Sequence, residues 1–185
     1  TDDDPSFGIS ASKFSGQNGR VTIHNSGEIV VTGTGGLPAT GISAQALGNA
    51  SPVSVSNSGD IRTTAGGDAF GIFALANGSI SVTNSGDIHA TAGNIANGIS
   101  AQTDGAGSSI GLVNSGDIYV TGRAFAAGIY AQTQGANSPI NIANSGSIRV
   151  TGPAGAVGID AVSFWTNSPI VIENSGSILG GTVGV

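Results

Sequence analysis

The sequence predicts an all-β protein, a right-handed parallel β-helix (β-solenoid) of about six coils with three short strands in each coil. Two repeated motifs carry this prediction. The tripeptide Asn-Ser-Gly occurs six times, at spacings of 32, 27, 30, 30 and 30 residues, and the dipeptide Gly-Ile recurs in step with it. Self-similarity at such a period is typical of solenoids. We expect one domain over residues 1–185, a segment of a longer protein, with repeat units starting near residues 8, 41, 71, 98, 128 and 158.

The fifth repeat shows why each unit should hold three strands. Apolar residues alternate with other residues over 128–132, 140–142 and 148–150, and turn-forming residues separate these segments. Alternation with a period of two indicates strands that are buried on one face. No segment keeps an apolar period of 3.6 residues, and 32 glycines disfavour helices.

Three short strands cannot bury their apolar faces alone, so copies must stack and pair in parallel. Five apolar positions recur in every copy and should form inward-facing columns, which begin in the first copy at Ile9, Ala11, Val21, Ile23 and Ile29. β-Branched residues dominate four of these columns, as a stacked pleated core favours. The right-handed winding follows from the general preference of parallel crossovers.

One asparagine per coil should form a structural ladder at a corner. Stacked side-chain amides can hydrogen-bond along such a column, and asparagine tolerates the left-handed backbone that we expect at a sharp corner. Ligand binding is the alternative role, but a binding group is not needed once in every coil. The ladder residues are Asn25, Asn57, Asn84, Asn114, Asn144 and Asn174.

Composition limits the partners. Charged residues make up 9% of the chain, with five Lys and Arg and a net charge of −6. Nucleic acids and anionic membranes need a basic surface, so we expect no nucleic-acid partner and no direct membrane insertion of this segment. The chain has no cysteine, which removes thiolate catalysis and cysteine-based metal sites.

We predict no catalytic, cofactor-binding or metal-ligating residue, and no cofactor. The two histidines, His24 and His89, lie in different repeats and cannot complete a catalytic triad together. The alternative is a carbohydrate-active β-helix enzyme of the polysaccharide lyase or hydrolase type. It would use an outward acidic column, which could instead bind Ca²⁺. The column contains Glu28, Asp60, Asp87 and Asp117.

A threonine column and a few aromatic residues leave further alternatives open. The column Thr32, Thr64, Thr91, Thr121 and Thr151 raises ice binding as a minor possibility, although its neighbours, such as Arg62 and Tyr119, are neither flat nor uniform. Aromatic residues interrupt the repeat and could contact a ligand, or else cover the core. These possible contacts are Phe73, Tyr130, Phe164 and Trp165.

The repeated Asn-Ser-Gly-Asp-Ile, together with Gly-Ile-x-Ala and a following Val-Thr-Gly, resembles the passenger domains of bacterial autotransporters, the type V secreted surface proteins. The resemblance covers nearly the whole chain. It implies an adhesin-like passenger that is exported across the outer membrane to the cell surface, where a C-terminal membrane barrel holds it. The matching motif is the scaffold itself, so it implies no functional residue.

These observations together predict a non-catalytic surface segment that mediates attachment or display, as part of a longer passenger. Its partner would be a protein or glycan on a host or neighbouring cell. The C-terminal segment from Ile178 to Val185 is apolar and uncharged. An end of this kind exposes unpaired strand edges, so we also expect end-to-end self-association.

Overall fold

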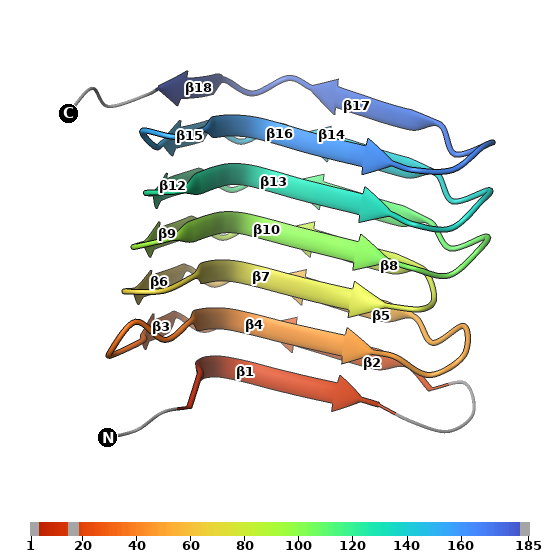
Figure 1. The fold of residues 1–185 in the computed structure, drawn as a ribbon, viewed down its shortest axis with the longest axis horizontal. Coiled ribbons are helices and arrows are strands. Elements are labelled where there is room, and N and C mark those ends of the chain that lie inside the picture. The colour runs from red at the N-terminus through yellow and green to blue at the C-terminus, as the bar shows by residue number, and fades with distance from the viewer. Residues whose placement is uncertain (1–3, 15–18, 182–185) are drawn as a thin grey trace.

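The computed structural model is a right-handed parallel β-solenoid of about six coils, and it describes residues 4–14 and 19–181. In Figure 1 the front strands run from left to right and the rear strands return from right to left as the chain climbs, which is right-handed winding. The predicted fold class, with three strands per coil, is confirmed. Residues 182–185 of the C-terminal segment lie outside the described part.

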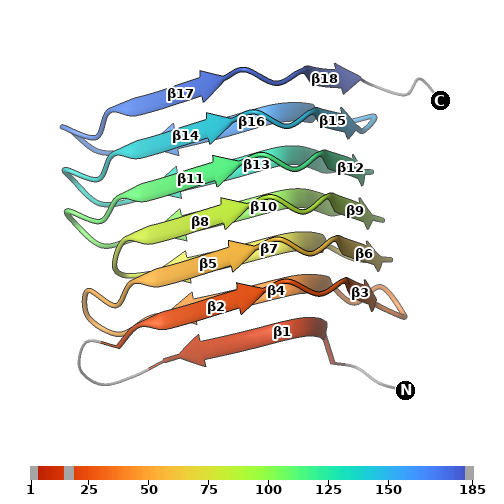
Figure 2. The same ribbon diagram turned by 180° about the vertical axis from the view of Figure 1, so that it is seen from behind.

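Each coil contributes one strand to each of three six-stranded parallel sheets, seen from behind in Figure 2. Sheet A contains β1 (Ser6–Lys13), β4 (Ala39–Ala46), β7 (Ala69–Ala76), β10 (Ile95–Thr103), β13 (Phe125–Thr133) and β16 (Ala156–Ser163). Sheet B contains β2 (Val21–Asn25), β5 (Val53–Asn57), β8 (Ile80–Asn84), β11 (Ile110–Asn114), β14 (Ile140–Asn144) and β17 (Ile170–Asn174). Sheet C contains β3 (Ile29–Thr32), β6 (Ile61–Ala65), β9 (Ile88–Ala92), β12 (Ile118–Gly122), β15 (Ile148–Thr151) and β18 (Ile178–Gly181).

The core consists of the predicted apolar columns. In the four inner coils the first column, Ile42, Ile72, Ile99 and Ile129, is fully buried. Equivalent residues pair directly between coils, so each column is continuous. In the last coil the inward residues Ile170, Ile172 and Ile178 are 40–45% exposed, because no described coil covers them.

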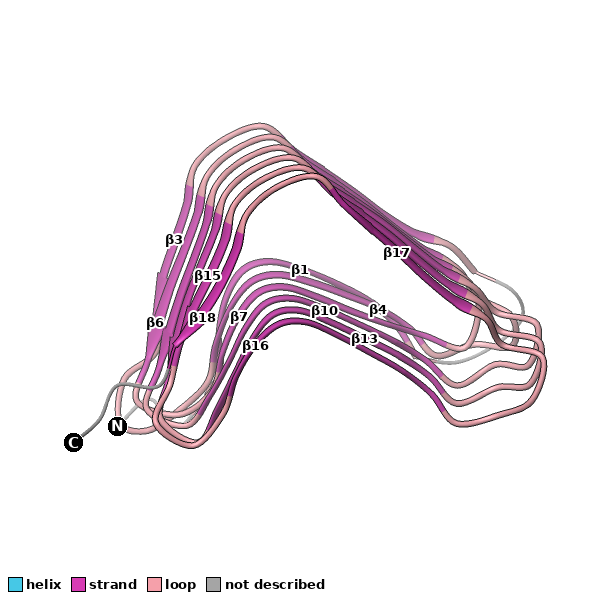
Figure 3. Ribbon diagram, turned by 90° about the horizontal axis from the view of Figure 1, so that it is seen from above, coloured by secondary structure: helices cyan, strands magenta, loops and turns pink. Residues whose placement is uncertain are grey.

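Sheet A bends sharply, so that its outer face is concave (Figure 3). The glycine of each Gly-Ile pair allows this bend to press against sheet C. A Cβ atom on Gly98 would lie 2.4 Å from Ile118 Cγ2 and 2.6 Å from the Gly128 carbonyl oxygen. Both distances are below any real Cβ contact, so the motif is a packing requirement of the bend.

The asparagine column forms a continuous ladder at the corner between sheets B and C. From Asn25 to Asn144, each Nδ2 donates to the Oδ1 of the next asparagine at 2.7–2.8 Å. All six Nδ2 atoms also donate to the glycine carbonyl two residues on. The prediction of a left-handed backbone at these asparagines was wrong. Among the described residues, the non-glycine positions with positive φ are Ala50, Asn137 and Asn167, which belong to the loops between sheets A and B. The amide ladder, not backbone strain, accounts for asparagine at this corner.

Candidate functional site

A hollow of about 390 Å³ lies on the outer face of sheet A, across the three consecutive strands β7, β10 and β13. We call it the aromatic slot. Its lining residues are Phe70, Ile95, Asn97, Gln102, Phe125 and Tyr130. The coil below contributes Phe70, the coil above contributes Phe125 and Tyr130, and the middle coil contributes the two amides. The slot therefore has aromatic sides and a partly polar floor.

The floor contains an unpartnered polar group. Asn97 is only 5% exposed, and its Oδ1 atom is buried without a hydrogen bond to any described residue. An unsatisfied buried acceptor of this kind costs about 1–3 kcal/mol. The equivalent positions in the neighbouring coils hold Phe70 and Ala127, so the repeat itself does not require an amide here. A polar group that destabilises the fold and is not needed by the repeat is a candidate for binding.

The other polar groups of the slot are uncharged, and some of their atoms already take part in hydrogen bonds within the protein. Gln102 Nε2 donates to Ser100 Oγ at 3.2 Å, which leaves the Gln102 carbonyl oxygen as an acceptor. The Tyr130 hydroxyl donates to Gln132 Oε1 at 2.5 Å. Burial, and then the Asp160 carboxylate, raise the pKa of the Tyr130 hydroxyl above its usual value. Tyr130 therefore remains a neutral phenol at neutral pH.

The structure brings two of the four predicted aromatic contacts together and leaves two elsewhere. Phe73 and Tyr130 lie on either side of Ser100 in register on sheet A. The Phe73 ring contacts the slot residue Phe70, with ring centroids 5.4 Å apart. Phe164 and Trp165 are exposed in the loop that follows β16, and they do not line the slot.

Sequence reasoning missed Phe70, Ile95, Asn97, Gln102 and Phe125 as members of one site. Each lies on sheet A in one of three successive coils, at or near a Gly-Ile marker. The signal that could have found them is a comparison of equivalent positions: the position just before this glycine holds Thr40, Phe70, Asn97 and Ala127 in successive coils. A position that changes chemistry so strongly within a regular repeat indicates a local role.

The acidic column has a structural role along sheet C. The Asp60 carboxylate accepts a hydrogen bond from the backbone N–H of Asp87 at 3.1 Å. Asp87 accepts one from the N–H of Asp117 at 2.9 Å, and Asp117 accepts one from the N–H of Ser147 at 2.8 Å. Glu28 instead lies 4.0 Å from Arg62, an exposed ion pair worth little. One oxygen of each of the three aspartates is thus committed to the turn of the next coil.

The outer face of sheet C also carries a stacked pair. The His89 and Tyr119 rings lie 4.7 Å apart at an angle of 14°. Burial, and then the nearby Arg62 guanidinium, lower the pKa of His89. His24 lies on β2 of sheet B and not beside this pair. The residues beside the threonine column, among them Arg62, His89 and Tyr119, therefore include aromatic rings and charged groups, so this face is not uniform.

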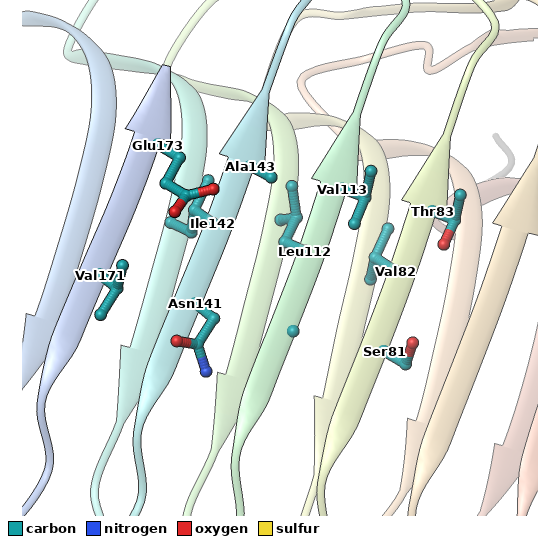
Figure 4. A pocket seen from close by; sticks show the side chains of 11 residues that line it. Ser81, Val82, Thr83, Leu112, Val113, Asn141, Ile142, Ala143, Val171 and Glu173 are labelled. Carbon is teal, nitrogen blue, oxygen red and sulfur yellow. The ribbon is translucent and has the colours of Figure 1, made fainter. Parts of the chain in front are cut away.

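A second hollow, of about 290 Å³, lies on the outer face of sheet B (Figure 4). It exists because Gly111, which lies between Ser81 and Asn141 in register, has no side chain. The remaining lining is mostly aliphatic, with residues such as Leu112 and Val171, and Glu173 lies at one side. This hollow follows from one glycine in a regular column, so it is a weaker candidate than the aromatic slot.

Two kinds of feature are absent from residues 4–14 and 19–181. No group of three or more His, Cys, Asp or Glu side chains in these ranges is placed to hold a metal ion. No helix in them is long and apolar enough to span a membrane.

Comparisons of the chain with protein-family models, with curated proteins and with solved structures gave no match.

Proposed function

We propose that this chain is a non-catalytic binding and display segment of a secreted bacterial surface protein. The observation that carries the proposal is the contrast between the regular scaffold and the aromatic slot. Ladders of asparagine and aspartate recur from coil to coil and hold the coils together. Within residues 4–14 and 19–181 the slot instead occurs once, across three coils, and contains the unpartnered Asn97 oxygen.

The proposed setting is the bacterial cell surface, reached by export across the outer membrane. The resemblance of the repeats to autotransporter passengers supports this setting. A rigid solenoid presents extended faces of side chains, which suits attachment to a protein or glycan on another cell. For this segment taken by itself, a second copy of the chain is a further proposed partner, because no described coil covers the inward residues of β17 and β18.

An adhesion experiment tests the proposal. Beads coated with the protein should attach saturably to cells or to immobilised cell-surface glycans. Beads coated with an unrelated folded protein of similar negative charge should not. Soluble protein should compete for the same attachment. Attachment equal to that of the control beads, over a broad panel of cells and glycans, would contradict the adhesive function.

The carbohydrate-active enzyme is the competing function, and the acidic column decides between them. We expect that incubation with a panel of polysaccharides releases no new reducing ends and no unsaturated sugars. The variants Asp87→Asn and Asp117→Asn keep an oxygen that can accept the backbone N–H of the next coil, so both should fold. Cleavage by the parent protein that disappears in either variant would establish the enzyme and exclude the scaffold.

A further inference from the structure

The spacing of the strands determines what can enter the aromatic slot. Adjacent strands in a sheet lie about 4.8 Å apart, so the strands that carry the aromatic sides, β7 and β13, are separated by roughly 10 Å. Carbon atoms in contact lie about 3.5–4.0 Å apart, so a ring between two aromatic faces needs about 7–8 Å between them. The slot over β10 can therefore receive one ring, but not two stacked rings.

The polar atoms of the floor determine what that ring must carry. Asn97 Oδ1 has no donor among the described residues, and the Gln102 carbonyl oxygen is a second acceptor in the lining of the slot. The terminal torsion of an asparagine is broad, so a rotation about the Cβ–Cγ bond can turn Oδ1 toward the hollow. A suitable ligand therefore brings hydrogen-bond donors at the edge of a ring whose faces are apolar.

The absence of charge in the slot further limits the class of ligand that it can bind. The lining residues carry no charge, so a charged ligand would lose hydration in the slot without gaining an opposite charge. The chain has a net charge of −6, which disfavours the phosphates of a nucleic acid. A purely apolar ligand would leave the Asn97 oxygen without a donor. A neutral sugar ring meets all three conditions, because its C–H faces are apolar and its hydroxyl groups donate.

We propose that the aromatic slot binds one neutral pyranose ring of a glycan, held between Phe70 and the pair Phe125 and Tyr130, with a sugar hydroxyl donating to Asn97 Oδ1. This inference rests on the proposed binding function and deepens it by naming the site and the ligand class. Neighbouring sugar units would extend outward along the concave face of sheet A, away from the single ring that is enclosed.

Calorimetric titration with neutral hexasaccharides tests the site. The probes are cellohexaose, maltohexaose and mannohexaose, with hexagalacturonate as a charged counterpart. We expect at least one neutral probe to bind with a stoichiometry of one, and hexagalacturonate to bind at least tenfold more weakly. Equal binding of the charged probe, or no binding of any neutral probe, would overturn the assignment of a neutral sugar.

Two variants locate the binding. Asn97→Ala reproduces the residue that the next coil holds at this position, so the fold should persist while affinity falls at least tenfold. Tyr130→Ala should weaken binding by a similar factor. Trp165→Ala is the matched control, since it removes an exposed aromatic ring outside the slot and should leave affinity unchanged. Circular dichroism and the urea midpoint check that each variant is folded.

The outcomes separate this inference from the proposed function. Bead adhesion that persists in Asn97→Ala and Tyr130→Ala would overturn the slot while supporting the adhesive segment. Sugar binding that the two slot variants abolish, together with beads that never adhere to cells, would support the slot and contradict adhesion. Sugar binding lost in Trp165→Ala but kept in both slot variants would move the site to the loop after β16.

Discussion

Replacing Asn114 by alanine tests how much the asparagine ladder stabilises the solenoid. The Asn114 amide donates to the Gly116 carbonyl at 2.7 Å and to Asn144 Oδ1 at 2.8 Å. Its own Oδ1 accepts from Asn84 Nδ2 at 2.8 Å. The substitution therefore leaves two acceptors and one N–H without partners at a corner where Asn84, Asn114 and Asn144 are at most 2% exposed.

The expected loss in the free energy of unfolding follows from these three groups. Each buried polar group without a partner costs about 1–3 kcal/mol. The total should lie near the low end, since Asn84 Nδ2 keeps its second bond, to the Gly86 carbonyl, and the corner can relax. We expect the free energy of unfolding to fall by about 3 kcal/mol. Urea denaturation followed by circular dichroism measures this as a lower midpoint.

The end of the ladder provides the matched control. Asn174 lies in the exposed last coil. Its loss removes the acceptor of Asn144 Nδ2, which keeps its bond to the Gly146 carbonyl, and the donor to the exposed Gly176 carbonyl. Asn174→Ala should therefore cost less than about 1 kcal/mol, because water can replace the lost partner. If Asn114→Ala were no more destabilising than Asn174→Ala, the ladder would not stabilise the inner coils and this reasoning would be refuted.

Three further predictions concern the bend, the outer face of sheet C and the open end. Gly98→Ala should lower the free energy of unfolding by about 1–3 kcal/mol, as measured by urea titration. Gly111→Ala should be tolerated, because the nearest atom to its added Cβ is a backbone oxygen 4.0 Å away. His89 should titrate below 6.5 by NMR, and Arg62→Gln should raise its pKa by removing a nearby positive charge. Because the folded pKa of His89 is lowered, its contribution to stability is complete above pH 6.5 and is lost as the pH falls toward that lowered value. The chain should self-associate as its concentration rises, as measured by sedimentation velocity. Ile172→Arg, which places a charge at the exposed end, should reduce this self-association. An unsubstituted chain that stays monomeric at every concentration would argue against end-to-end contact.

Much of the fold could be predicted from the sequence because a solenoid repeats its local physics in every coil. The apolar alternation around Ile42, Ile72 and their equivalents identified the inward faces, since a strand has a side-chain period of two. Stacking was the one arrangement that could bury three short strands per unit. The asparagine ladder could be predicted for the same reason: one amide per coil, at the same position, must meet its own copies.

The corner conformation and the acids could not be predicted so well. An asparagine suits both a left-handed turn and an amide ladder, and the sequence did not show that the ladder alone operates at this corner. The sequence alone leaves catalysis and Ca²⁺ binding open as roles of the aspartates. Sequence could not show that Asp87 accepts the backbone N–H of Asp117, because that bond depends on the orientation of a turn one coil away.

The sequence by itself determined the coil, the three sheets and the inward columns, because each depends on residues that recur with the repeat. Only the tertiary structure decided where the aromatic slot lies. Its residues come from three coils and are up to 60 positions apart, as from Phe70 to Tyr130. They gather only because sheet A bends into a concave face, and that bend depends on Gly98 and its equivalents packing against sheet C. A repeat pattern specifies what each coil has in common, whereas a site formed from the differences between coils needs their stacking in space.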